Sequence, residues 1–231
     1  MGAWIVRDAR QHDAQACATI YAPYVTDSAV SFESEPPSAA EMEQRIATAQ
    51  RSHAWIVLQD DRQVVGFAYG GQFRTRAAYR WSCEVSVYIE LGRRRSGAGR
   101  ALYDALLERL AGRGFATAFA GMTLPNDASK GLHRAMGFQP VGVFRQVGWK
   151  HGRWHDVAWM QRPGMYSETS PSRTQEPSSW LWWTCGGDMS LPAHRPCRRA
   201  RACPPSARWS RGCERESRES RAPSETAVVG T

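Results

Sequence analysis

The stretch from Trp81 to Arg100, WSCEVSVYIELGRRRSGAGR, decides the fold of this chain. In its first half, apolar and polar side chains alternate from Cys83 to Ile89, and this period of two predicts a strand. Its second half is a turn rich in arginine and glycine. An apolar pattern at helical spacing follows directly, from Leu102 to Leu110. The sequence therefore predicts a strand, a glycine turn and a helix in immediate succession.

The turn between this strand and this helix is suited to bind an anion. The first amides of a helix lack internal partners, and the helix dipole adds positive charge at the same end. Gly97 and Gly99 let the backbone approach a ligand, and Arg94, Arg95 and Arg100 add positive charge. A diphosphate is the ligand that this pattern indicates, although a plain tight turn would contain the same glycines. The turn lacks the pattern of a nucleotide-triphosphate loop and the position of a dinucleotide fingerprint.

Several segments around this turn match one known family. Arg94, Gly97 and Gly99 fit a Gln/Arg-x-x-Gly-x-Gly/Ala signature. The other matching segments are SFE at 31–33, AYRWSCEVSVYI at 78–89, LPND at 124–127 and KHGRWHDV at 150–157. Together they resemble the GCN5-related N-acetyltransferase (GNAT) family, in particular its phosphinothricin and methionine-sulfone acetyltransferase branch. The resemblance spans nearly all of residues 3–162.

The remaining periodicities predict an α/β protein with one folded domain. The predicted element order is β-α-α-β-β-β-α-β-α-β-β, which gives a mixed central sheet with helices on both faces and is also the order of the GNAT acyl-CoA N-acyltransferase fold. Ser38 and Glu41 form a capping box before the second helix. We expect residues 1–165 to form the acetyltransferase domain. Residues 166–231 are rich in serine, proline and arginine without periodicity, which predicts a disordered basic tail.

Composition limits where the chain works and what it binds. The 231 residues carry a formal charge of +8, which suits small anionic ligands as well as nucleic acid, but no nucleic-acid-binding motif is present. No apolar run of about 20 residues predicts a membrane span, and the N-terminus does not resemble a secretory signal. Cys17 and Cys83 fall in predicted elements as buried thiols. We therefore expect a cytoplasmic protein with neither membrane nor nucleic acid as a partner.

Metal binding is not expected. His151, His155 and Asp156 are close in sequence, but two of them fall at a predicted hairpin turn without a third converging ligand. The cysteines beyond residue 184 lack the close pairs of a zinc site.

The resemblance implies acetyl-CoA as co-substrate and assigns residues to it. The backbone of Val87, Tyr88 and Ile89 would hold the pantetheine arm as an added strand would. The amides of the turn would take the pyrophosphate, and they belong to Arg94, Arg95, Ser96, Gly97, Ala98 and Gly99. Asn126, at the end of the next strand, would reach the cofactor from the other side. The alternative for Asn126 is a turn residue after proline.

Acetyl transfer from a thioester to an amine needs a base for the ammonium and an acid for the leaving thiolate. Glu84 is the candidate base, because an unpaired carboxylate is costly to bury in an otherwise apolar strand and its presence there needs a specific reason. An ion pair with Arg74 or Arg76 is the alternative reason. His133 is the candidate acid or a substrate ligand, at a position where many GNAT enzymes carry tyrosine. A purely structural histidine is the alternative there.

The acceptor is expected to be anionic. The loop before the strand that carries Glu84 contains Arg74, Arg76 and Tyr79. Guanidinium groups bind planar oxyanions through paired N–H groups. A solvated basic loop would contain the same residues. Phe32 would close the pocket from the opposite side, unless it is an ordinary buried aromatic.

The resemblance thus implies direct acetyl transfer to the α-amine of a small amino-acid analogue, such as phosphinothricin, methionine sulfoximine or methionine sulfone, by a homodimer. A peptide or protein N-acetyltransferase is one alternative, and a non-catalytic acyl-CoA-binding module is another.

Overall fold

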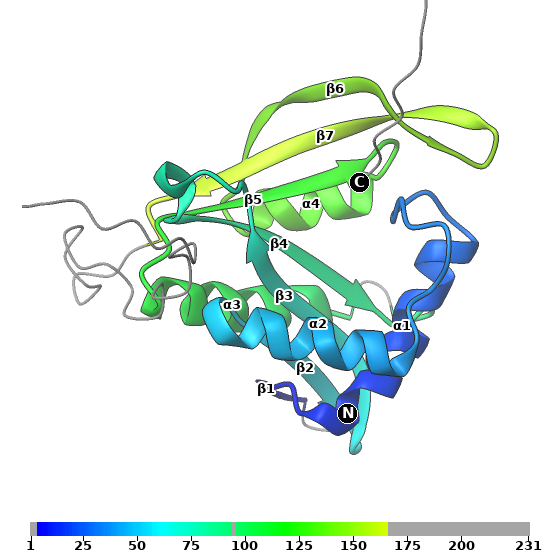
Figure 1. Cartoon of the computed structure of the whole chain (residues 1–231), viewed down its shortest axis with the longest axis vertical. Coiled ribbons are helices and arrows are strands. Elements are labelled where there is room, and N and C mark those ends of the chain that lie inside the picture. The colour runs from blue at the N-terminus through cyan, green and yellow to red at the C-terminus, as the bar shows by residue number, and fades with distance from the viewer. Residues whose placement is uncertain (1–3, 94–95, 166–231) are drawn as a thin grey trace, which may run out of the picture. The chain divides into compact units, whose positions relative to one another are not determined.

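The structure is a computed structural model that describes residues 4–93 and 96–165. The chain divides into two compact units, residues 1–184 and 185–231, and every described residue belongs to the first. Its elements, shown in Figure 1, are β1 (Ile5–Asp8), η1 (Gln11–Asp13), α1 (Ala14–Thr26), α2 (Ala39–Ser52), β2 (Trp55–Asp60), β3 (Gln63–Gln72), η2 (Ala77–Tyr79), β4 (Ser82–Ile89), α3 (Ala98–Gly112), β5 (Thr117–Thr123), α4 (Asp127–Ala135), β6 (Gln139–Lys150) and β7 (Arg153–Pro163). The predicted order of strands and α-helices is confirmed, with two short 3-10 helices, η1 and η2, in addition.

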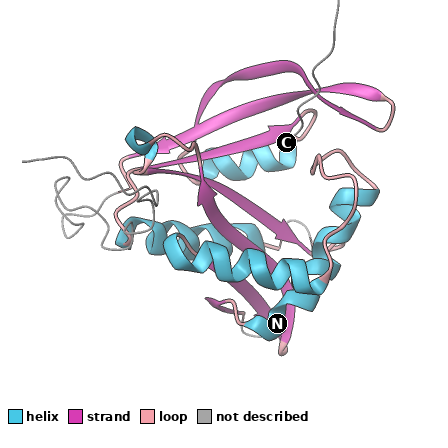
Figure 2. Ribbon diagram, in the orientation of Figure 1, coloured by secondary structure: helices cyan, strands magenta, loops and turns pink. Residues whose placement is uncertain are grey.

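The strands form one mixed sheet in the order β1-β2-β3-β4-β5-β7-β6 (Figure 2). Every neighbouring pair is antiparallel except β4 and β5, which are parallel. The predicted mixed sheet is therefore confirmed, with β5 as the strand that pairs in parallel. None of the helices described between residues 4 and 165 is long and apolar enough to cross a membrane.

β4 and β5 run side by side for only a short distance. Their pairing extends from Ser82↔Thr117 to Glu84↔Phe119. Beyond that point β4 continues beside β3 and β5 continues beside β7, so the two strands diverge (Figure 1). The second half of β4 therefore presents a backbone edge toward a gap in the sheet rather than toward β5.

Helices cover both faces of the sheet, as predicted. On one face, α3 packs its Leu102, Leu106 and Leu110 against the sheet, and all three side chains are fully buried. On the other face, α1 and α2 cover Trp55, Val57 and Phe67. Alternate residues of β2 thus point into two separate cores, which is the pattern of a strand buried on both faces.

Local signals explain where elements begin and turn. The hydroxyl of Ser38 accepts a hydrogen bond from the Glu41 amide at 3.2 Å, and the Glu41 carboxylate accepts one from the Ser38 amide at 2.7 Å. The predicted capping box is therefore confirmed. The β2–β3 hairpin turns through Asp61 and Arg62 at φ values of 46° and 71°, as a tight two-residue hairpin turn requires.

Candidate functional site

A cavity of about 370 Å³ opens on the α1/α2 face of the sheet, beside the point where β4 and β5 diverge. It brings together three of the predicted site residues: Glu84 from β4, Arg74 from the β3–β4 loop and Phe32 from the α1–α2 loop. We call it the acceptor cavity. Its other lining residues, which the sequence reasoning missed, are Val30, Gly121, Met122, Thr123, Phe144, Val147, Val157 and Trp159.

Glu84 lines the acceptor cavity from β4. Its neighbours Cys83 and Val85 are buried in the core on the opposite face, as the alternation predicted. Burial raises the pKa of the Glu84 carboxyl above its usual value, and the positive charge of Arg74 offsets part of that rise. Among the residues that the structure describes, no ion pair within 4.0 Å joins Glu84 to an arginine. Glu84 and Arg74 instead line the same cavity.

Arg74 is held by an aromatic platform. Its guanidinium carbon lies 4.6 Å from the ring centroid of Phe73. That ring in turn stacks on Phe119 of β5, with centroids 4.0 Å apart. Such stacking restrains the guanidinium while leaving its N–H groups able to bind an oxyanion.

Arg76 and Tyr79 do not line the acceptor cavity. Arg76 is the residue before η2, and Tyr79 is 41% exposed with its ring 5.9 Å from that of Phe73. Their substrate role stays a prediction.

Phe32 extends from the α1–α2 loop and rests on the backbone of β6. A Cβ atom at Gly148 would overlap the Phe32 ring, so only glycine leaves room for the ring there. Phe32 is 43% exposed, and it is therefore not an ordinary buried aromatic. It forms one wall of the acceptor cavity.

The turn before α3 has the geometry of an anion site in its described part. Gly97 is the N-cap residue of α3 and has a φ of 91°, in the left-handed region that favours glycine. The amide of Ala98, the first residue of α3, donates a 3.4 Å hydrogen bond to the Ser96 hydroxyl. At Gly99, a Cβ atom would lie 2.9 Å from Cδ2 of Leu132, so this glycine also permits close packing with α4. Arg94 and Arg95 lie outside the described residues.

The backbone edge of β4 is fixed by contacts on both faces. Val87 and Ile89 pack against the α3 core, whereas Tyr88 packs edge-on against Tyr21 and Tyr24 of α1. The Tyr24 hydroxyl also donates a 2.6 Å hydrogen bond to the carbonyl of Ile89. No local pattern in the sequence indicates this contact, because the two residues lie 65 positions apart.

Asn126 caps a helix. Its side-chain oxygen accepts a 3.1 Å hydrogen bond from the amide of Ser129 at the start of α4. This is the local role that its place after proline allowed. The predicted contact with the cofactor stays a prediction.

His133 belongs to α4, and its ring packs against Tyr103 of α3. The residue is 3% exposed. Its Nδ1 lies 2.7 Å from the carbonyl oxygen of Ser129, and its Nε2 lies 2.9 Å from the Tyr103 hydroxyl. A carbonyl only accepts, so Nδ1 carries the proton and Nε2 accepts from Tyr103. Burial lowers the pKa of His133, which favours this neutral form. His133 is not among the residues that line the acceptor cavity.

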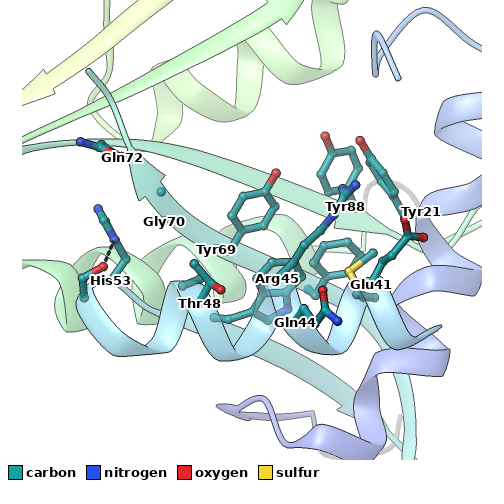
Figure 3. A pocket seen from close by; sticks show the side chains of 16 residues that line it. Tyr21, Glu41, Gln44, Arg45, Thr48, His53, Tyr69, Gly70, Gln72 and Tyr88 are labelled. Atoms are coloured by element: carbon teal, nitrogen blue, oxygen red, sulfur yellow. Dashed lines mark hydrogen bonds between the residues drawn. The ribbon is translucent and has the colours of Figure 1, made fainter. Parts of the chain in front are cut away.

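A second and larger cavity, of about 560 Å³, lies between α2 and the sheet (Figure 3). Arg45 and Thr48 of α2 line it from one side, and Tyr69 and Tyr88 line it from the strands. Of the predicted site residues that the structure describes, only Tyr88 lines this cavity. Within the described part of the chain, no group of three or more His, Cys, Asp or Glu side chains could hold a metal ion.

Comparison with known proteins assigns the family. Residues 6–159 match the model of an acetyltransferase (GNAT) domain. The chain is 37% identical over 157 residues to phosphinothricin N-acetyltransferase of Streptomyces viridochromogenes, covering 68% of this chain and 86% of that protein. It is 34% identical over 158 residues to an L-methionine sulfoximine/L-methionine sulfone acetyltransferase of Pseudomonas aeruginosa, covering 68% and 92%.

A solved structure agrees with these relatives. The crystal structure of a GNAT superfamily phosphinothricin acetyltransferase from Sinorhizobium meliloti, in complex with AcCoA, matches with a TM-score of 0.70 at 37% identity. The match covers 76% of this chain and 97% of that one. The resemblance noted from the sequence is therefore confirmed. The chain belongs to the GNAT family of acetyltransferases.

Proposed function

We propose that this protein transfers the acetyl group of acetyl-CoA to the α-amine of a small amino-acid analogue of the phosphinothricin, methionine sulfoximine or methionine sulfone type. The observation that carries the proposal is the presence of Glu84 and Arg74 in one cavity beside the diverging strands. The names of the relatives support the same substrate class.

Acetyl-CoA fits the gap beside β4. The edge of Val87 to Ile89 is not paired with β5, so its amides and carbonyls can bind the pantetheine arm. The turn carrying Ser96, Gly97, Ala98 and Gly99 offers helix-terminal amides to the pyrophosphate. When bound, acetyl-CoA supplies the activated acyl carbon, and these residues fix its place. Arg94, Arg95 and Asn126 remain proposed cofactor contacts.

Glu84 is the proposed base for the acceptor amine. Only the neutral amine attacks the thioester, so the ammonium must first lose a proton to the carboxylate. The nitrogen then forms a bond to the acyl carbon, and the carbon–sulfur bond breaks to release the thiolate. A carboxyl whose pKa is raised by burial holds that proton better than an ordinary glutamate.

Arg74 is the proposed anchor for the acceptor carboxylate. It lies in the same cavity as Glu84, and its guanidinium can bind a carboxylate through two N–H groups. Phe32 and the apolar residues of β6 and β7 would contact the acceptor side chain. We keep Arg76 and Tyr79 as proposed contacts for a second anionic group.

His133 stays a proposed acid for the thiolate. To act as the acid, His133 would have to be the imidazolium, donating from Nε2 to the Tyr103 oxygen while the Tyr103 hydroxyl passes its own proton to the thiolate, which leaves a neutral imidazole and an intact hydroxyl. Replacing either residue then interrupts this relay.

We also propose a cytoplasmic homodimer. β6 is an edge strand of the sheet, and large apolar side chains on β6 and β7 are about half exposed. They are Val141, Val143, Phe144, Val147, Trp149 and Trp154. A second copy of the chain would cover this surface. The free thiols of Cys17 and Cys83 suit a reducing compartment. Sedimentation of the purified protein should give twice the chain mass, and a monomer at micromolar concentration would refute the dimer.

The test of the proposed function is release of the coenzyme A thiol with a panel of acceptors. We expect turnover with the three analogues and little with ordinary amino acids or a short peptide. Arg74→Met should raise the acceptor KM and leave the acetyl-CoA KM unchanged. Turnover with peptide alone would refute the substrate class.

A further inference from the structure

Lys150, the last residue of β6, binds the end of α1 and the loop that follows it through three hydrogen bonds of one ammonium group. Its ammonium donates to three main-chain carbonyls, those of Val25 at 2.5 Å, Ser31 at 2.7 Å and Glu33 at 2.9 Å. These acceptors lie between 117 and 125 residues away in the sequence. An ammonium has three N–H groups, so this one arrangement can use every donor of the side chain.

The position of these carbonyls is what matters for the site. Ser31 and Glu33 are the residues on either side of Phe32, which forms a wall of the acceptor cavity. The ammonium of Lys150 therefore fixes the backbone before and after Phe32 at once. Gly148, two residues earlier on the same strand, provides the surface on which the Phe32 ring rests.

The loop that Lys150 binds is also held by side chains of α1 and α2. The Tyr21 hydroxyl lies 2.7 Å from the Ser31 hydroxyl and donates to the Glu33 carboxylate at 2.9 Å. Arg45 of α2 binds the same carboxylate through two N–H groups at 2.7 and 3.0 Å. The helical side of the loop is thus held by α1 and α2. Lys150 links the loop to β6, and Nε2 of the next residue, His151, lies 3.3 Å from the Ser28 carbonyl oxygen of the same loop.

We infer that Lys150 is a positioning residue for the acceptor, because its ammonium holds Phe32 against Gly148 as a wall of the acceptor cavity. Lys150 does not line the cavity itself and acts only through this wall. The inference rests on the proposed function for the identity of what the cavity binds. The three hydrogen bonds from the Lys150 ammonium, which we call the Lys150 clamp, belong to the fold, and their effect on the loop can be measured without turnover.

The kinetic test uses Lys150→Met, which keeps an unbranched side chain only one atom shorter and removes all three donors. We expect the acceptor KM to rise by up to about 100-fold, the scale of cost when a substrate-positioning group is misplaced by an ångström. The acetyl-CoA KM should stay within about twofold of wild type. Arg153→Met is the matched control, because it removes an exposed positive charge from the same hairpin.

Two further variants separate the clamp from a general loss of structure. Gly148→Ala displaces the Phe32 ring without touching Lys150, so it should raise the acceptor KM in the same way. In the Phe32→Ala background, Lys150→Met should add little, because the wall it holds is already gone. An unchanged acceptor KM in folded Lys150→Met or in Gly148→Ala would overturn the inference. So would full additivity with Phe32→Ala.

Amide hydrogen exchange gives a readout that does not depend on catalysis. In Lys150→Met, the amides of residues 27–33 should exchange faster, whereas Arg153→Met should leave them unchanged. If the wild-type protein acetylates no acceptor of the panel, the proposed function fails. The exchange of this loop then decides the clamp alone, and equal protection in wild type and Lys150→Met would refute it.

Discussion

Replacing Glu84 by glutamine tests the chemistry at one atom. Glutamine keeps the shape of the side chain and cannot accept the ammonium proton. The buried neighbours Cys83 and Val85 face the opposite core, so the substitution does not disturb packing there. Arg74 also stays in the cavity, and binding of the acceptor carboxylate is retained.

We expect kcat/KM to fall by about 10² to 10⁴, the usual contribution of a positioned general base. This corresponds to about 2.7 to 5.4 kcal/mol of transition-state stabilisation, at about 1.36 kcal/mol for each factor of ten. In the wild-type protein, the acid limb of the pH profile should lie above the usual pKa of a glutamate, because burial raises the pKa of Glu84. Glu84→Gln should lose that limb.

Although Glu84→Gln should lose activity, its thermal stability should not fall. A raised carboxyl pKa means that the folded state favours the protonated form, so ionisation of Glu84 costs stability as the pH rises through its folded pKa. Thermal unfolding of Glu84→Gln at neutral pH should therefore occur at or above the wild-type temperature. This difference should shrink as the pH falls toward the ordinary glutamate pKa.

Glu90→Gln is the matched control, because Glu90 is an exposed glutamate that pairs with Arg93 in the turn after β4. It should leave the pH profile unchanged. If Glu84→Gln retains wild-type turnover at every pH while the protein remains folded, the general-base assignment is wrong.

Three further substitutions and one truncation have defined outcomes. Gly97→Ala forces a residue with a Cβ into the left-handed region, so the free energy of unfolding should fall by about 1 to 2 kcal/mol and the acetyl-CoA KM should rise. An unchanged acetyl-CoA KM would argue against the turn as the pyrophosphate site. His133→Phe leaves the buried hydroxyl of Tyr103 without its acceptor, which should cost about 1 to 3 kcal/mol in chemical denaturation. If His133 also serves as acid, kcat should fall in His133→Phe and Tyr103→Phe alike, and equal kcat in all three proteins would dismiss that role. A chain ending at Met165, whose amide bonds to the carbonyl of Ala116, should keep the turnover of the full chain; loss of activity in a folded truncation would assign a function to residues 166–231.

The sequence predicted those features that are recorded locally. The alternation from Cys83 to Ile89 placed Glu84 on the face opposite its buried neighbours, and the structure has it there. The capping box at Ser38 was also correct, because both of its hydrogen bonds are made between residues three apart. Resemblance and residue chemistry also predict a shared site for Glu84, Arg74 and Phe32, and all three line one cavity.

Other features depend on contacts that no local pattern carries. The Lys150 clamp joins residues more than 100 positions apart, and no pattern around the end of β6, which carries Lys150, indicates it. The pairing of His133 with Tyr103 likewise depends on how α4 packs on α3. The walls contributed by β6 and β7 were missed because their apolar residues fit a structural hairpin equally well. Phe144 and Val147 are exposed because β6 is an edge strand of the sheet, and the local sequence does not indicate that position.

The measurement that tests the central claim most directly is thiol release from acetyl-CoA by the full-length protein, with the acceptor panel and the Glu84→Gln variant side by side. We expect turnover with phosphinothricin, methionine sulfoximine or methionine sulfone, and a loss of about 10² or more in Glu84→Gln. Tight binding of acetyl-CoA without turnover of any acceptor would contradict the proposed acetyl transfer.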